Sequence, residues 1–111
     1  MRIALACLVV AIGLLGQPRH TSGFMVIGSG VRSCGAWTAD RRYPDSIAAL
    51  MDEQWILGFL TGSGDATPGD ADPLHGVDAE AVWAWVDNYC RANPLDKIIR
   101  AGEAFFREHP S

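Results

Sequence analysis

The sequence predicts a small all-α protein: a bundle of three main helices plus a short N-terminal helix, held by one inter-helix disulfide. Three observations predict this fold. Apolar residues recur at helical spacing in three separate stretches of the chain. A residue type that favours helix caps stands ahead of each helical stretch. Two cysteines, Cys34 and Cys90, fall in different predicted helices. The length of 111 residues allows a single domain.

Residues 1–23 are expected to be a signal peptide that is not part of the folded domain. Arg2 supplies a positive start, and residues 3–16 form an uninterrupted apolar run. This run is shorter than the roughly 20 residues that cross a bilayer and has the length of a signal-peptide core. Small residues place the cleavage near Gly23, and a buried N-terminal helix is the alternative. The mature domain is then residues 24–111, periplasmic or secreted.

Cleavage would remove Cys7 and leave Cys34 and Cys90 as the only cysteines of the mature chain. In an oxidising compartment such a pair usually closes, so we expect a disulfide between them, with two buried free thiols as the alternative. Closing a loop of about 57 residues stabilises a fold by about 4 kcal/mol. That contribution matters because the core of a chain of about 88 residues is marginal.

The first helix is expected to begin after Ser33 as its cap and to end near Arg42, ahead of Pro44. Residues 24–27 form a short apolar run before it. The pattern fits either a strand or an ordered tail, and the sequence leaves both open.

The central helix is expected to follow Asp45 or Ser46 and to end near Thr61, with Gly62 terminating it. Its apolar residues lie on nearly all sides, which is typical of a helix buried on most of its surface. Gly58 is then interpreted as the point where a neighbouring helix approaches closely.

A loop rich in Gly, Pro and Asp is expected over residues 61–76. The third helix follows Asp78 as its cap. We expect the last helix to be capped by Asn93, with Pro94 in its first turn, and to end near Glu108. Its predicted apolar stripe consists of Leu95, Ile98, Ile99, Gly102, Phe105 and Phe106.

No catalytic motif is recognised in the mature chain. His75 lies in the loop and His109 beside the C-terminus, without the flanking residues of a Ser-His-Asp arrangement. Asp52 and Glu53 are adjacent, so they point apart on a helix, which fits solvent exposure better than acid–base catalysis. The sequence predicts that the protein is not an enzyme, and a small hydrolase using His75 is the less favoured alternative.

No metal or cofactor is expected either. Asp65, Asp70 and Asp72 resemble a calcium loop in composition only, because the spacing of an EF-hand is absent. Residues 28–30 lack the third glycine of a dinucleotide fingerprint. The net charge is −4 and Lys97 is the only lysine, which argues against nucleic acid as a partner.

Four tryptophans are many for so short a chain. Tryptophan fills cores and is also enriched at binding hot spots. We expect Trp55 to lie in the core. Trp83 and Trp85 lie at the two edges of an apolar arc, so they are the candidates for a partner surface or a homodimer seam.

The order of these motifs resembles small secreted proteins of the HdeA and type VI immunity (Rap/Tai) kind. The motifs that carry the resemblance are Ser33-Cys34 with Trp37, the stretch 55–62, the stretch 85–90 and residues 93–95 before a final amphipathic helix. The resemblance covers residues 33–108. It implies a helical domain with an inter-helix disulfide, at Cys34 and Cys90 here, and a periplasmic binding protein without enzymatic activity.

Two forms of binding activity follow from this resemblance: neutralising one specific effector, or protecting misfolded clients in acid. The expected mature chain has 13 acidic residues against seven basic ones, a net charge of −6, and becomes strongly positive once its carboxylates are protonated. Charge repulsion would then loosen the bundle. The alternative is an envelope structural protein or dimeric helper.

Overall fold

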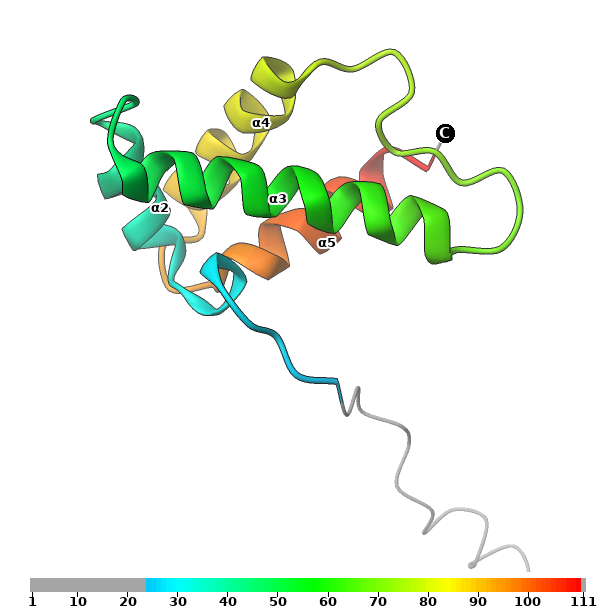
Figure 1. Cartoon of the computed structure of the whole chain (residues 1–111), viewed down its shortest axis with the longest axis horizontal. Coiled ribbons are helices and arrows are strands. Elements are labelled where there is room, and N and C mark those ends of the chain that lie inside the picture. The colour runs from blue at the N-terminus through cyan, green and yellow to red at the C-terminus, as the bar shows by residue number, and fades with distance from the viewer. Residues whose placement is uncertain (1–23, 111) are drawn as a thin grey trace, which may run out of the picture.

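The computed structural model describes residues 24–110 and shows an all-α domain in which no residue forms part of a strand. The export segment expected over residues 1–23, with Cys7, lies outside the described residues. A short 3-10 helix, η1 (Ser29–Val31), precedes four α-helices, which are α2 (Cys34–Arg41), α3 (Ile47–Ala66), α4 (Ala79–Ala92) and α5 (Ile98–Glu108). Figure 1 shows α3 lying across the front, with α4 and α5 behind it and α2 at one end.

Three helices begin where the sequence predicts. Their caps are Ser33, Ser46 and Asp78, whose side-chain oxygens accept a backbone N–H three residues further on, at 3.0, 3.1 and 2.8 Å. Each bond satisfies one of the N–H groups that a helix start leaves without an intrahelical partner. The three caps therefore fix the starts of α2, α3 and α4.

The prediction that the central helix ends near Thr61 is wrong, because α3 continues through Gly62 and Gly64 to Ala66. A glycine within a helix costs roughly 1 kcal/mol, which packing can outweigh. Here the buried side chain of Leu60 anchors this end, and Gly64 lies close to the ring of Pro73 from the following loop. Although α3 is the longest helix, no helix among the described residues is both long and apolar enough to cross a membrane.

The predicted start of the last helix is also wrong, since α5 begins at Ile98 and Asn93 is the C-terminal cap of α4. The segment between α4 and α5 is held in place by hydrogen bonds from the start of α2. The carbonyls of Pro94 and Asp96 accept the first backbone N–H groups of α2 at 3.0 and 2.7 Å. A turn that supplies these acceptors cannot also be helical, and it leaves Leu95, expected in the apolar stripe, 93% exposed.

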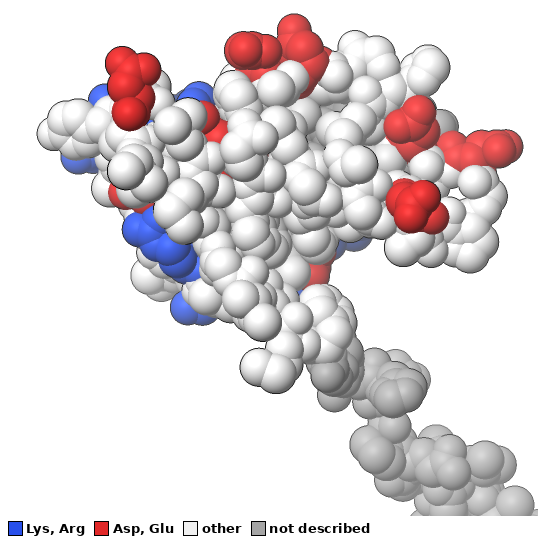
Figure 2. Space-filling view, viewed as in Figure 1, with Lys and Arg blue, Asp and Glu red and all other residues white. Residues whose placement is uncertain are grey.

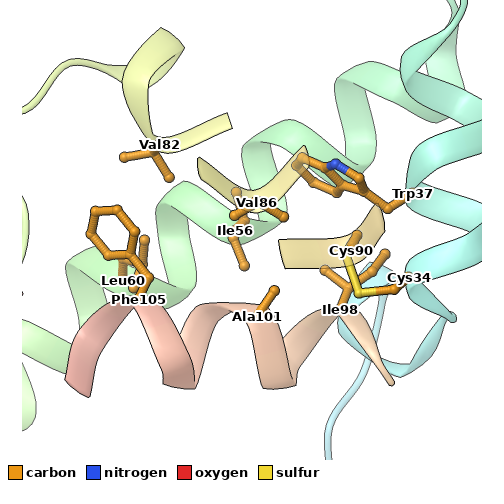
Figure 3. Packing of buried hydrophobic residues seen from close by; sticks show 10 residues of the cluster. All are labelled: Cys34, Trp37, Ile56, Leu60, Val82, Val86, Cys90, Ile98, Ala101 and Phe105. Atoms are coloured by element: carbon orange, nitrogen blue, oxygen red, sulfur yellow. A yellow bond between two sulfur atoms is a disulfide. The ribbon is translucent and has the colours of Figure 1, made fainter. Parts of the chain in front are cut away.

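The core lies between α3, α4 and α5, and α2 closes one end of it (Figure 3). Cys34 at the start of α2 and Cys90 near the end of α4 form the predicted disulfide, fully buried, with a Cα–Cα distance of 4.7 Å. The other buried members of the cluster are Trp37, Ile56, Leu60, Val82, Val86, Ile98, Ala101 and Phe105.

The glycine that permits close helix packing is Gly102 on α5. A Cβ atom there would lie 2.7 Å from a ring carbon of Phe59 on α3. The corresponding prediction for Gly58 is wrong, because a Cβ atom on Gly58 would meet nothing within 4 Å. Gly58 therefore lies on the outer side of α3, not between helices.

Candidate protein-binding surface

The helix α3 has a buried side and an exposed side, and both carry apolar residues. Its fully buried side chains are Ala49, Asp52, Ile56 and Leu60. On the opposite side, Ile47, Leu50 and Met51 are 77%, 48% and 61% exposed. A surface helix usually carries polar or charged residues on its solvent side. The apolar start of α3 is thus an exposed hydrophobic patch, the type of feature that marks interaction sites.

The second half of the exposed side of α3 is flat. Gly58 and Gly62 have open space where a side chain would stand. Between them, the hydroxyl of Thr61 donates to the carbonyl of Leu57 in the preceding turn at 2.8 Å. With that hydroxyl engaged by its own helix, this half offers another protein a smooth surface with few groups to desolvate.

The exposed side of α3 is also free of charge between Asp45 and Asp65. The only charged residues in that interval are Asp52 and Glu53, and both are buried. In Figure 2, viewed as in Figure 1, white surface follows α3 while coloured side chains lie around its margins. We call this uncharged surface the α3 face; it comprises Ile47, Leu50, Met51, Gln54, Gly58, Thr61 and Gly62.

Trp55 forms one edge of the α3 face and fixes the chain that precedes η1. Its indole N–H donates to the carbonyl of Ile27 at 2.9 Å, and its ring stacks on Phe59 with centroids 5.4 Å apart. Gly30 lies directly against this ring, since a Cβ there would be 2.2 Å from it. Trp55 was expected in the core, but it is only partly buried.

The segment held by Trp55 extends the apolar surface. Residues 24–27 form neither strand nor helix, which answers the question that the sequence left open. Phe24, Met25 and Ile27 are 62%, 85% and 80% exposed. Because the carbonyl of Ile27 accepts the hydrogen bond from Trp55, the Ile27 end of this apolar segment lies beside that edge of the α3 face.

A hollow of about 460 Å³ opens between the second half of α3 and the end of α5. Phe59 and Phe106 line it together with Ala66, while Glu103 and Arg107 contribute charged groups. Its mixed lining would accept an apolar side chain of a bound protein next to the α3 face.

The inner side of α3 carries charges, contrary to the expectation that Asp52 and Glu53 are exposed. Glu53 is 4% exposed, and Arg41 from α2 binds it at 2.7 Å. The same guanidinium binds Asp87 on α4 at 2.9 Å, and the indole N–H of Trp37 donates to Asp87 at 2.7 Å. One arginine thereby joins α2, α3 and α4 through two carboxylates.

A second cluster surrounds Asp52, which is fully buried. Arg32 binds Asp52 at 3.0 Å and Asp40 at 2.5 Å. Burial raises the pKa of Asp52 above the ordinary aspartate value, and its hydrogen bond with Asp40 acts in the same direction. Burial opposes ionisation of Asp40 too, but hydrogen bonds from Arg32 and from Asp52 lower the pKa of Asp40. Asp52 and Glu53, the two buried acidic residues of α3, are therefore enclosed and paired with arginines, and they link helices.

Trp83 and Trp85, predicted as a partner surface, are both half-buried and engaged within the chain. The indole N–H of Trp83 donates to the backbone carbonyl of Glu53 at 3.1 Å. Trp85 packs edge-on against Phe105 and His109, with centroids 5.3 and 5.8 Å away. Their role in binding a partner stays a prediction, and the α3 face exposes far more of its apolar side chains.

The two histidines of the described segment make separate contacts. His75 is exposed in the loop, 3.5 Å from Asp72. His109 stacks on Phe105 and forms a hydrogen bond with its carbonyl. Across residues 24–110, no three His, Cys, Asp or Glu side chains are grouped so that they could hold a metal ion.

The sequence contained a signal for the α3 face that was interpreted differently. Apolar residues on nearly all sides of α3 predict a helix that is buried on most of its surface. The same pattern arises when one side packs on the core and the other awaits a partner. The absence of any exposed charge between Asp45 and Asp65 is compatible with either interpretation, so only the structure distinguishes them.

Comparison of the chain with models of protein families, with curated proteins and with solved structures found no significant match.

Proposed function

We propose that this protein is exported, is processed near Gly23, and acts in the periplasm or outside the cell by binding another protein rather than by catalysis. The observation that carries the proposal is the α3 face, an exposed, uncharged surface that includes Ile47, Leu50 and Met51. The buried centres of protein interfaces are depleted in charge in the same way.

The compartment is supported by the buried disulfide between Cys34 and Cys90. Disulfides of this structural kind persist in oxidising compartments and are rare in the cytosol. The apolar run at residues 3–16 supplies the type of sequence that export requires. An intact-mass measurement of the exported protein would locate the cleavage site.

Variants of equal chemistry on and off the α3 face test the proposal. Leu50→Glu places a charge among the exposed apolar side chains of the α3 face. Leu95→Glu is the matched control, because Leu95 is 93% exposed and lies outside that face. The exported protein is used for affinity capture from periplasmic extract at pH 7, followed by mass spectrometry. Each captured protein is then purified, and its Kd is measured for the parent protein, for Leu50→Glu and for Leu95→Glu.

We expect one dominant partner whose affinity falls at least about tenfold with Leu50→Glu, because a charge must be desolvated in the interface, and stays unchanged with Leu95→Glu. Partners that bind all three forms equally would contradict the assignment to the α3 face. Turnover of a substrate by the purified protein would contradict the absence of catalysis.

A second candidate, protection of misfolded proteins in acid, is supported by the buried ion pairs. Arg32 and Arg41 are held across α2, α3 and α4 by ion pairs with carboxylates, and these ion pairs are lost once acid neutralises the carboxylates. The bundle would then loosen while the chain becomes strongly positive. Suppression of client aggregation at pH 3 but not at pH 7 would support this candidate, whereas a bundle that stays closed and binds no client at pH 3 would exclude it.

A further inference from the structure

The two halves of the α3 face complement each other in shape. The first half carries the large side chains Ile47, Leu50 and Met51, while the second half is flattened by Gly58 and Gly62. Gln54 stands between them. Ile47 and Thr61 are each seven residues from Gln54, and Leu50 and Gly58 are each four residues from it.

This arrangement is what a two-fold axis through Gln54 requires. In an antiparallel pair of α3 helices, Leu50 and Met51 of one copy would pack over Gly58 of the other. Ile47 would pack over Thr61 and Gly62. Each large residue would meet a small one, and the same contacts would occur twice, as in every isologous dimer.

We propose that α3 binds a second copy of this chain through the α3 face, in antiparallel orientation with the dyad at Gln54. The inference rests on the proposed function, in that it names the protein that occupies the same surface. The occupant is identified by the self-complementary shape described above and by the distribution of charge at the two ends of α3.

Charge favours the antiparallel orientation. Three exposed carboxylates, Asp65, Asp70 and Asp72, lie at or beyond the end of α3, and no Lys or Arg occurs between Arg42 and Arg91. A parallel pair would bring the acidic ends of both copies together. The antiparallel pair separates these ends by the length of α3, about 28 Å, which exceeds the Debye length of about 8 Å. It also brings Asp65 near both Arg42 and Asp45 of the second copy, where the positive and the negative charge offset each other.

The size of the surface sets the expected affinity. A helix face about 28 Å long and about 10 Å wide offers roughly 300 Å² per copy, whereas stable interfaces bury about 800 Å² per partner. Trp55 and the exposed Ile27 that lies beside it can add to this area. We therefore expect weak association, with a Kd in the micromolar range or above.

Sedimentation of the exported protein from about 1 µM to about 1 mM tests the dimer. Gly58→Leu is the decisive variant, since the open space at Gly58 lets the monomer fold normally. A leucine would fill the groove for Leu50 and Met51 and weaken association at least about tenfold. A nonspecifically sticky surface would instead associate more strongly, because Gly58→Leu adds apolar area. Leu95→Glu is the control that should associate as the parent protein does.

Single cysteines then test orientation and register. Gln54→Cys lies at the dyad, so two copies should cross-link on mild oxidation. Thr61→Cys should not cross-link with itself, but it should cross-link with Ile47→Cys. Cross-linking of Thr61→Cys with itself would overturn the antiparallel arrangement.

A protein that remains monomeric at every concentration would overturn the dimer but leave the proposed function standing, which is tested by the response of other partners to Leu50→Glu. Capture of a partner that ignores Leu50→Glu, together with a dimer that Gly58→Leu disrupts, would overturn the proposed function and support the dimer.

Discussion

Replacing Arg41 by methionine tests whether the buried ion pairs hold the helices together. Arg41 binds Glu53 on α3 and Asp87 on α4, and methionine keeps much of its aliphatic stem while removing the charge. Two carboxylates would lose their cation, one of them only 4% exposed. Removing one partner of a buried pair usually costs 3–5 kcal/mol. Because the Arg41 side chain is 22% exposed, we take the lower end, about 3 kcal/mol.

The assay is reversible urea unfolding at pH 7, with thermal melting as a second measurement. For a domain of this size about 3 kcal/mol corresponds to a fall in Tm of roughly 12–24 °C. Arg42→Met is the matched control, since its side chain is exposed and the expected change is within about 0.5 kcal/mol. A loss below about 1 kcal/mol for Arg41→Met would refute the reasoning, because solvent would then be replacing the guanidinium without cost.

Three further predictions concern stability. Reducing the buried disulfide should lower the free energy of unfolding by about 4 kcal/mol in urea titrations with and without reductant, and a change below about 1 kcal/mol would contradict the closed-loop argument. Gly102→Ala should cost about 1–3 kcal/mol because its Cβ would lie 2.7 Å from a ring on α3, whereas Gly58→Ala should stabilise by roughly 0.5–1 kcal/mol; equal effects would contradict the assigned packing. Asp52→Asn and Asp40→Asn should show opposite pH dependence in unfolding titrations from pH 3 to 7. Because the pKa of Asp52 is raised, ionising this group lowers the free energy of unfolding of the parent protein as the pH rises above about 3.8. Asp52→Asn cannot ionise, so its stability relative to the parent should increase with rising pH. The lowered pKa of Asp40 gives stability that is present above that pH and lost in acid, so Asp40→Asn is least stable relative to the parent at neutral pH. Parallel profiles for these two variants would contradict the assignment.

The sequence predicts the helical content and most helix starts correctly, because these depend on local chemistry. Ser33, Ser46 and Asp78 cap helices with their own side chains, which requires no knowledge of the rest of the fold. The disulfide could be predicted because removal of the expected export segment would leave only Cys34 and Cys90 in the chain. The helix starts depend on residues within one turn of the cap, and the disulfide follows from the number of cysteines.

The errors arise where distant parts of the chain decide the local structure. Asn93 and Pro94 have the pattern of a helix start, but the first turn of α2 binds the carbonyls of this segment. Asp52 and Glu53 look solvent-exposed until Arg32 and Arg41 are placed against them. Each outcome depends on a contact between residues separated by 12 or more positions, and helical periodicity does not contain that information.

Only part of the candidate surface can be predicted from the sequence. Apolar residues all around α3 were visible, but which of its two sides meets the core depends on where α4 and α5 pack. The exposed positions of Ile47 and Met51 follow from the buried positions of Ile56 and Leu60 on the opposite side. Trp83 and Trp85 are half-buried and contact other residues of the chain, and their role in binding a partner stays a prediction.

We infer that a protein, either a second copy or another chain, covers the α3 face after export. A photo-reactive amino acid in place of Met51, in cells that export the protein, tests it most directly, with the same substitution at Leu95 for comparison. We expect cross-links to protein from position 51, to a second copy or to another chain, and few from position 95. Equal cross-linking from both positions, or none from position 51, would contradict the claim that this surface is where the protein binds.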